Sequence, residues 1–280
     1  MATDVATPLD RDTAPVRRTR PKRSRNVGDK LISLALLVVL LVVGEVAARL
    51  ELVSPLILPA PSDVANALVS GFESGVYWSH AYSTVYSAVA GFLIAAAVAV
   101  TSAGVLSSIE RMERVLMPFI VAFQSMPKIA IAPLFVIWLG FDEGSKIAVT
   151  ATICFFPMLI NSLQGFKVRD RDTYELFASL GASRWQTFRY LRLPGSAPYV
   201  FAGFHVGAIF ALIGTVVTEF IGSRAGLGYL LIQQQSQFNV PGVFAVVLLL
   251  MVIGIGFNRG MLLLERRAAP WAKAISGTSP

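Results

Sequence analysis

Cysteine and charged residues are scarce in this 280-residue sequence, and both shortages narrow what the protein can be. The single cysteine, Cys154, permits no internal disulfide and no cysteine metal cluster. Because Cys154 lies inside an apolar run, we expect a buried and inert thiol. The sequence also lacks a Walker phosphate loop, an acidic metal cluster and a cooperating Ser/His/Asp set. We therefore predict that this chain is not an enzyme.

Charged residues make up only 15% of the chain, whereas ordinary soluble domains carry about 25%. Hydrophobic residues reach 55%, and the mean hydropathy is +0.64. A soluble core could not enclose this much apolar surface, so lipid must surround most of it. The composition therefore predicts an integral membrane protein.

Six stretches contain the roughly 20 mostly apolar residues that a helix needs to cross a bilayer. They are Leu31–Leu50, Ser83–Ser107, Val115–Gly140, Lys146–Phe166, Pro198–Ile221 and Gly242–Leu264. The predicted fold class is all-α, a polytopic membrane protein with six transmembrane helices and a cytoplasmic loop of short helices. The six-span domain covers residues 31–265, between a disordered basic tail at 1–30 and a second cytoplasmic tail at 266–280. A cleaved signal peptide at Leu31–Gly44 does not fit, because a long basic segment precedes it and no clean cleavage site follows.

The basic residues alternate between the two sides of the predicted spans. Eight Lys or Arg residues precede residue 31 and six lie in the loop at 167–194, whereas the stretch at 51–80 has none. Basic loops face the cytoplasm, so we predict that both termini and the loop at 167–194 are cytoplasmic. The basic tail could also bind nucleic acid or anionic lipid, but fixing the orientation is the simpler explanation.

Two segments outside the spans also have helical signals. Leu58–Asp63 is Pro-rich and predicts an external turn, where Ser62 can cap a short amphipathic helix with Val64 and Leu68 on one face. The connection at 222–240 is too long and too polar for a tight turn. We expect a short interfacial or partly re-entrant helix there.

The cytoplasmic loop at 167–194 predicts two short helices joined by a turn. A capping side chain is followed three residues later by Glu or Gln in two places, Asp172/Glu175 and Ser183/Gln186. Gly181 lies between them, where a left-handed residue would end the first helix, and Pro194 would end the second. Helices of about two turns are unstable alone, so the spans, a partner protein or both must pack against them.

The spacing of residues in this loop is informative. Glu175 is followed six positions later by Gly181, and Leu191-Arg192-Leu193-Pro194 begins after nine more residues. This pattern resembles the loop Glu-Ala-Ala, three residues, Gly, nine residues, Ile-x-Leu-Pro of binding-protein-dependent ABC importer permeases. Leu176 and Phe177 replace the two alanines, and Leu191 replaces the isoleucine.

Other stretches, within about residues 31–265, resemble the nitrate, sulfonate and taurine branch of that family. They are Leu58–Val64, Ser125–Leu134, Trp138–Gly140, Glu219–Ile221 and Gly226–Tyr229.

The resemblance implies that the chain works with other proteins. In that family the first loop helix sits in a groove of a cytoplasmic ATPase, which binds ATP and Mg, so no cofactor is expected in this chain. The implied partners are two ATPase subunits, a second permease copy forming a homodimer, and an external solute-binding protein, in a bacterial plasma membrane and without nucleic acid. The implied coupling residues are Glu175, Phe177, Ala178, Gly181, Ala182, Leu193 and Pro194. For Glu175, a role in capping its helix alone remains the alternative.

Polar residues inside a membrane are costly and are candidates for function. Lys128 lies roughly 16 Å below the outer end of the third span and follows Pro127, which should kink the helix. With Gln124 and Met126, Lys128 is a candidate to line the path of a small anion such as a sulfonate, nitrate, taurine or an organic acid. Alternatively, its amine bonds carbonyls that the kink frees. Pro127 and Glu219 are candidates for a gate or hinge.

Three further polar residues have structural explanations. We expect His205 to be a buried histidine with a satisfied partner. Glu45 and Arg49 are four residues apart and can pair on one helix face.

Two other functions compete with the importer permease. A secondary carrier usually has paired repeats and acidic residues near the membrane midplane, and neither is evident here. A membrane scaffold would leave Pro127 and Lys128 at mid-depth without an explanation.

Overall fold

The computed structural model describes residues 27–167 and 171–271, and these residues form helices without a strand. The predicted all-α fold class is confirmed. In chain order the helices are α1 (Val27–Arg49), α2 (Pro61–Glu73), α3 (Val76–Ser108), α4 (Glu110–Ser125), α5 (Ala132–Leu139), α6 (Glu143–Lys167), α7 (Arg171–Ser179), α8 (Arg184–Thr187), α9 (Leu193–Gly222), α10 (Leu227–Ser236) and α11 (Val240–Ala268). A 3-10 turn, η1 (Lys128–Ile131), precedes α5, and a π turn, η2 (Phe188–Arg192), precedes α9. The predicted tails at 1–30 and 266–280 lie mostly outside the described residues.

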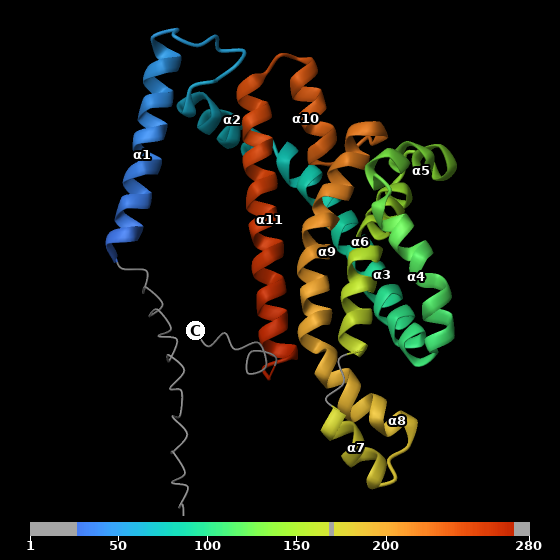
Figure 1. The fold of residues 1–280 in the computed structure, drawn as a ribbon. Coiled ribbons are helices and arrows are strands. Elements are labelled where there is room, and N and C mark those ends of the chain that lie inside the picture. Colours follow the sequence, from blue (N-terminus) through green and yellow to red (C-terminus); the bar gives the residue numbers. More distant parts are fainter. Residues whose placement is uncertain (1–26, 168–170, 272–280) are drawn as a thin grey trace, which may run out of the picture.

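Within the described residues, five helical segments are long and apolar enough to cross a membrane. They correspond to the first, second, fourth, fifth and sixth predicted spans, which are α1, α3, α6, α9 with α8, and α11. α3 extends beyond the predicted span at its start, because Val76–Tyr82 continues the helix. Figure 1 shows the end of α11 on the side of the molecule from which α7 and α8 project.

The third predicted span, Val115–Gly140, is broken more sharply than the predicted kink at Pro127. The structure divides it into α4 and η1–α5, which are bent by 83° relative to each other. Met126 is extended, with φ −71° and ψ 137°, because a residue before proline is excluded from the helical region. The sequence therefore located the disruption at Pro127 correctly but underestimated it.

The core lies where α6 packs between α3 and α9 (Figure 1). Small side chains let the helix axes approach closely, and α3 presents a buried stripe of them at Ala88, Ala95, Ala99 and Ala103. Cys154 of α6 is fully buried, and its thiol donates to the Gly207 carbonyl at 3.2 Å. The predicted burial of this cysteine is thus confirmed.

Helix α1 stands apart from the bundle in Figure 1, and polar contacts join its C-terminal end to α2. The predicted pair is present, with Arg49 Nε 3.0 Å from Glu45 Oε1. Ser62 is not the cap of α2 that we predicted, because the helix begins at Pro61 after Ala60. Its hydroxyl instead donates to Glu45 at 2.8 Å. The predicted amphipathic face is confirmed, since Val64 is buried against the bundle.

The connection at 222–240 contains the predicted short helix, α10. Leu227 and Leu230 of α10 are buried against Val246 of α11. Asn239 caps α11 by accepting a hydrogen bond from the Gly242 amide at 3.2 Å. α10 therefore covers the end of the bundle opposite α7 and α8 (Figure 1).

Candidate functional site

Helices α7 and α8 form a knuckle that projects beyond the ends of α6 and α9 (Figure 1). Gly181 adopts φ +71° between the two helices. The Gly181 amide donates to the Ala178 carbonyl at 3.1 Å, and the Ala182 amide donates to the Phe177 carbonyl at 3.0 Å. These two bonds form a Schellman motif, which ends α7 and turns the chain. The predicted glycine turn is confirmed.

One of the two predicted capping boxes is present. The Ser183 amide donates to Gln186 Oε1 at 2.7 Å, and the Gln186 amide donates to Ser183 Oγ at 3.2 Å. Asp172 was predicted to cap α7, but the helix begins at Arg171, so Asp172 lies inside its first turn. Arg169, which the loop analysis counted among the basic residues, lies outside the described residues.

Pro194 does not end the second loop helix as predicted. The chain continues as helix from Arg184 to Gly222, through the π turn η2. The Leu193 amide bonds the Phe188 carbonyl five residues back, which widens the helix immediately before the proline ring. Pro194 then occupies the first turn of α9, where its missing N–H costs little. As a consequence, the knuckle is continuous with a membrane-spanning helix.

Aromatic contacts attach the knuckle to the bundle. The Phe188 ring lies 5.7 Å from the ring of Phe166 in α6 and 5.8 Å from the ring of Trp185. The Trp271 indole donates to the Pro194 carbonyl at 3.1 Å, which connects the start of α9 to the chain after α11. A displacement of the knuckle would therefore reach α6, α9 and α11 together.

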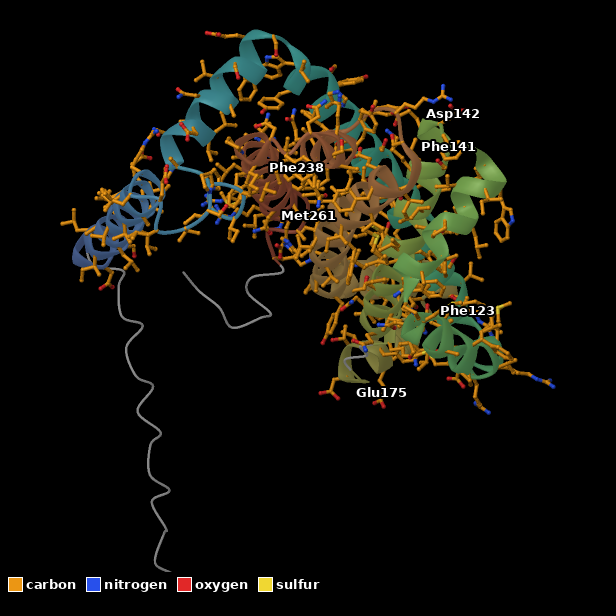
Figure 2. The ribbon with its side chains drawn as sticks, turned by 90° about the horizontal axis from the view of Figure 1, so that it is seen from above. Phe123, Phe141, Asp142, Glu175, Phe238 and Met261 are labelled. Carbon is orange, nitrogen blue, oxygen red and sulfur yellow. The ribbon has the colours of Figure 1, made fainter. Side chains whose placement is uncertain are left out.

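The residues predicted for coupling lie in two places. Glu175, Ala178 and Gly181 are exposed on the knuckle, and Phe177 and Ala182 are half-buried beside them. Glu175 lies at the edge of the molecule in Figure 2. Leu193 and Pro194 lie at the joint between the π turn and α9.

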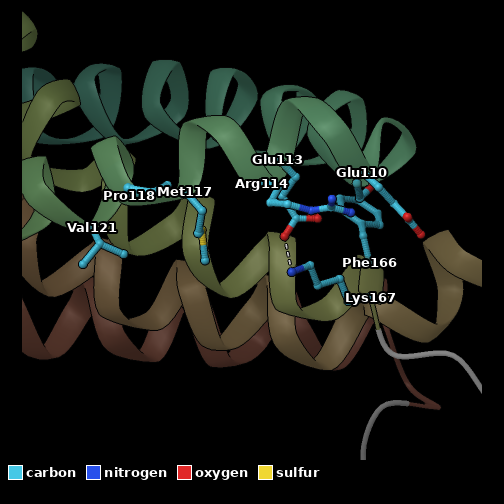
Figure 3. A pocket seen from close by; sticks show the side chains of 9 residues that line it. Glu110, Glu113, Arg114, Met117, Pro118, Val121, Phe166 and Lys167 are labelled. Atoms are coloured by element: carbon cyan, nitrogen blue, oxygen red, sulfur yellow. Dashed lines mark ion pairs between the residues drawn. The ribbon is translucent and has the colours of Figure 1, made fainter.

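A cavity of about 840 Å³ opens at the same end of the bundle, between α4 and the end of α6 (Figure 3). Its walls combine charged and apolar side chains. Glu113 of α4 forms an ion pair with Lys167 of α6 across it. Met117 and Phe166 supply apolar surface. We had not predicted this cavity, because it forms between helices that are distant in sequence.

The predicted path residues lie at the break in the third span. Lys128 Nζ donates to the Gln124 carbonyl at 3.2 Å and lies 5.7 Å from the centre of the Phe156 ring. This is the geometry expected of an amine that satisfies a carbonyl near a proline kink. Met126 is 46% exposed. A cavity of about 160 Å³ beside Pro127 and Lys128 is otherwise lined by apolar side chains.

Glu219 belongs to a buried polar network at the opposite end of the bundle. It is 1% exposed. Its carboxylate accepts hydrogen bonds from the Thr84 hydroxyl of α3 and the Gly228 amide of α10, both at 2.8 Å. Lys146 Nζ lies 4.0 Å from the same carboxylate. Gly226 has φ +120°, and a Cβ there would lie 2.0 Å from Glu219, so only glycine fits beside it.

Lys146 begins the fourth predicted span, and we had predicted no role for it. It is 2% exposed. Its amine bonds Glu143 at 2.7 Å, Ser83 at 2.7 Å and the Ala225 carbonyl at 3.1 Å. Glu143 also accepts from Ser83 and Ser87 of α3. The spacing of three residues between Glu143 and Lys146 was the available signal, because it places both on one helix face.

His205 has the partner that we expected. Its Nε2 lies 2.9 Å from Glu265 Oε2, which joins α9 to α11. The histidine side chain is about three-quarters buried.

Comparison with known proteins agrees with this architecture. Residues 91–270 match the family described as "Binding-protein-dependent transport system inner membrane component". The formylaminopyrimidine transport permease protein ThiX of Halalkalibacterium halodurans is 34% identical, over 84% of this chain and 93% of that protein. The putative aliphatic sulfonates transport permease protein SsuC of Bacillus subtilis is 29% identical, over 99% of this chain and 100% of that protein.

A solved structure of an amino acid ABC transporter has the same fold. It has a TM-score of 0.59 at 17% identity and covers 71% of this chain and 97% of that chain. These matches include the knuckle and the helices on either side of it. Their extent shows the family to which the chain belongs. The chain belongs to the inner-membrane permease components of binding-protein-dependent ABC importers, which are non-catalytic subunits that rely on a separate ATPase.

Proposed function

We propose that the knuckle is the surface through which an ATPase subunit drives this permease. Exposed Glu175, Ala178 and Gly181 would enter a groove of the ATPase, and Phe177 and Ala182 would shape the contact. Leu193 and Pro194 would pass the movement to α9. The observation that carries this proposal is the unbroken helix from Arg184 to Gly222, which makes the knuckle one end of a membrane-spanning lever.

The permease would work as a homodimer with two ATPases and an external solute-binding protein. One chain supplies one knuckle, and two ATPases require two. The termini and the knuckle would lie in the cytoplasm, since basic residues concentrate in the loop at 167–194 and before residue 31. ATP and Mg would bind only to the ATPase.

The solute that we propose is a small anion, such as a sulfonate, nitrate, taurine or an organic acid. Lys128 provides a cation at the break of the third span, beside Gln124 and Met126. The relative SsuC is named for aliphatic sulfonates, which fits this class. Pro127 would act as a hinge for this segment, and Glu219 as part of a gate at the opposite end.

A small heterocycle is a second candidate solute. The relative ThiX is named for formylaminopyrimidine. The rings of Phe123 and Phe156 are stacked 5.9 Å apart near Lys128, and Phe123 is 56% exposed, so a flat solute would stack on its outer face. Uptake with the matching binding protein separates the two classes. Replacing Lys128 with Gln should reduce uptake of an anion at least tenfold and leave uptake of a neutral heterocycle within twofold. Unchanged uptake of an anionic solute would reject a path role for Lys128.

Co-purification of the ATPase with tagged permease tests the docking surface. Glu175→Arg should abolish co-purification, because it reverses the charge of an exposed side chain on the proposed contact. Gly181→Trp should do the same by adding bulk, whereas Gly181→Asn should preserve the complex, since asparagine tolerates a positive φ. Gel filtration would show that each variant remains folded. Retention of the ATPase by both disruptive variants would refute the proposal.

A further inference from the structure

A polar pocket of about 470 Å³ lies where the knuckle meets the turn between α3 and α4. Its lining includes the cations Arg184 and Arg192, the hydroxyl groups of Ser107, Ser108 and Thr187, and the carboxylate of Glu110. Two guanidinium groups against one carboxylate leave the pocket with a net positive lining. Guanidinium groups and hydroxyls together are suited to bind a phosphate group.

The two arginines of this pocket lack partners within the described part of the chain. Arg192 Nε is buried and has no hydrogen-bond partner there. Neither guanidinium forms a recorded hydrogen bond or ion pair with another described residue. An unsatisfied buried donor is costly, so a ligand that accepts a hydrogen bond from Arg192 Nε would be favoured at this place.

An apolar groove of about 610 Å³ adjoins the polar pocket. The two share Ser108, Arg184 and Phe188 in their linings. The groove runs along the last turns of α3, where Val105 is 49% exposed, and is closed on the other side by Trp185 and Phe188. Its wall is therefore mostly hydrophobic.

We propose that these two hollows form a binding site for an anionic glycerophospholipid. The phosphate would lie between Arg184 and Arg192 and accept hydrogen bonds from their guanidinium groups, while an acyl chain would follow the groove past Val105. Basic pockets between membrane helices commonly bind such headgroups. The bound lipid would brace the joint between the knuckle and α3–α4. The inference goes beyond the proposed function, because it requires only that this end of the bundle lie at a membrane surface.

Lipid retention by the assembled transporter tests this site. The transporter is placed in nanodiscs of phosphatidylcholine with 20% radiolabelled phosphatidylglycerol, washed in detergent and counted for bound label. The paired Arg184→Gln and Arg192→Gln variant should retain at least fivefold less label than wild type. Arg189→Gln is the matched control, because Arg189 lies in the same π turn but lines neither hollow, and it should retain the wild-type amount. Equal retention by the double variant would overturn the proposal.

The groove and the source of the phosphate are tested separately. Val105→Trp fills the groove without changing a charge and should also reduce retained phosphatidylglycerol at least fivefold. Inorganic phosphate at 10 mM should displace little of the lipid from wild type. Full displacement by phosphate, or no effect of Val105→Trp, would show a simple anion site and overturn the assignment to lipid.

The ATPase could instead cover these hollows in the complex. A Ser108→Cys reporter in a Cys154→Ser background should be protected from maleimide by phosphatidylglycerol, with at least fivefold slower labelling. In nanodiscs of phosphatidylcholine alone, the same cysteine should react freely even with the ATPase bound. Protection that depends on the ATPase and not on the lipid would overturn the proposal.

Discussion

At the scale of single residues, one ammonium group lies at the centre of the buried network at the end of the bundle opposite the knuckle. Lys146 bonds Glu143 directly and lies 4.0 Å from Glu219, and both Lys146 and Glu219 are buried. The hydroxyls of Ser83 and Thr84 complete the network from α3. Buried charges are tolerated only when they are paired and hydrogen-bonded, so the members of this network should be strongly interdependent.

Replacing Lys146 with Met should destabilise the folded permease by about 3–5 kcal/mol, because Glu219 would keep a buried and uncompensated charge. Equilibrium unfolding in mixed micelles measures this loss. Lys128→Met is the matched control and should cost less than about 1 kcal/mol, since Lys128 is only partly buried and bonds one carbonyl. A similar loss of unfolding free energy in the two variants would contradict the proposed interdependence of the network residues.

Replacing Gly226 with Ala should disturb the same network from the other side. The added Cβ would lie 2.0 Å from Glu219 Oε1, and the φ of +120° disfavours any side chain. We expect the segment before α10 to detach, which limited proteolysis of the purified permease would detect as faster cleavage near residues 223–228. Gly260→Ala in α11 is the control, because its Cβ would meet nothing within 4 Å. Equal cleavage rates would count against the close fit.

At the scale of elements, the break in the third span is the least regular part of the bundle. α4 ends at Ser125, Met126 is extended, and η1–α5 leaves at an angle of 83°. Proline inside a helix costs about 3 kcal/mol, and Pro127 makes the broken form the cheaper one.

Replacing Pro127 with Ala should straighten the third span. Spin labels at Phe119 and Ile137, one on each side of the break, report its geometry by their separation. We expect the average distance to lengthen by several ångströms and its distribution to narrow, as a continuous helix of about 1.5 Å rise per residue would require. An unchanged distance distribution would show that tertiary packing, and not the proline, sets the bend.

The sequence predicted elements better than it predicted their junctions. Apolar length located the membrane helices, and glycine and serine signals located the turn at Gly181 and the cap at Ser183, because these depend on local chemistry. The prediction that Pro194 ends the second loop helix was wrong because a π turn before the proline lets the helix continue. Such a turn has no clear signature in the local sequence. The sequence did not indicate a role for Lys146, because its partners Ser83 and Ala225 are distant in the sequence. Both hollows proposed to hold lipid form only when α3, α8 and η2 come together.

At the scale of the whole molecule, α9 connects the two ends of the bundle. It has 30 residues and therefore spans about 45 Å. Pro194 and the knuckle lie at one end, and Glu219 of the buried network lies at the other. A rigid helix of this length would carry a displacement of the knuckle to the network that holds the external segment. This arrangement is how ATP hydrolysed on another subunit could open and close the far side of the permease.

The accessibility of α7 in the assembled transporter tests this account most directly. Ser179→Cys in a Cys154→Ser background places an exposed thiol on the knuckle, and a membrane-impermeant maleimide is applied to sealed vesicles of either orientation. The account predicts labelling only from the cytoplasmic side, at least tenfold slower labelling when the ATPase is bound, and loss of ATP-driven uptake after labelling. Labelling from the outer side, or full uptake by a fully labelled transporter, would contradict it.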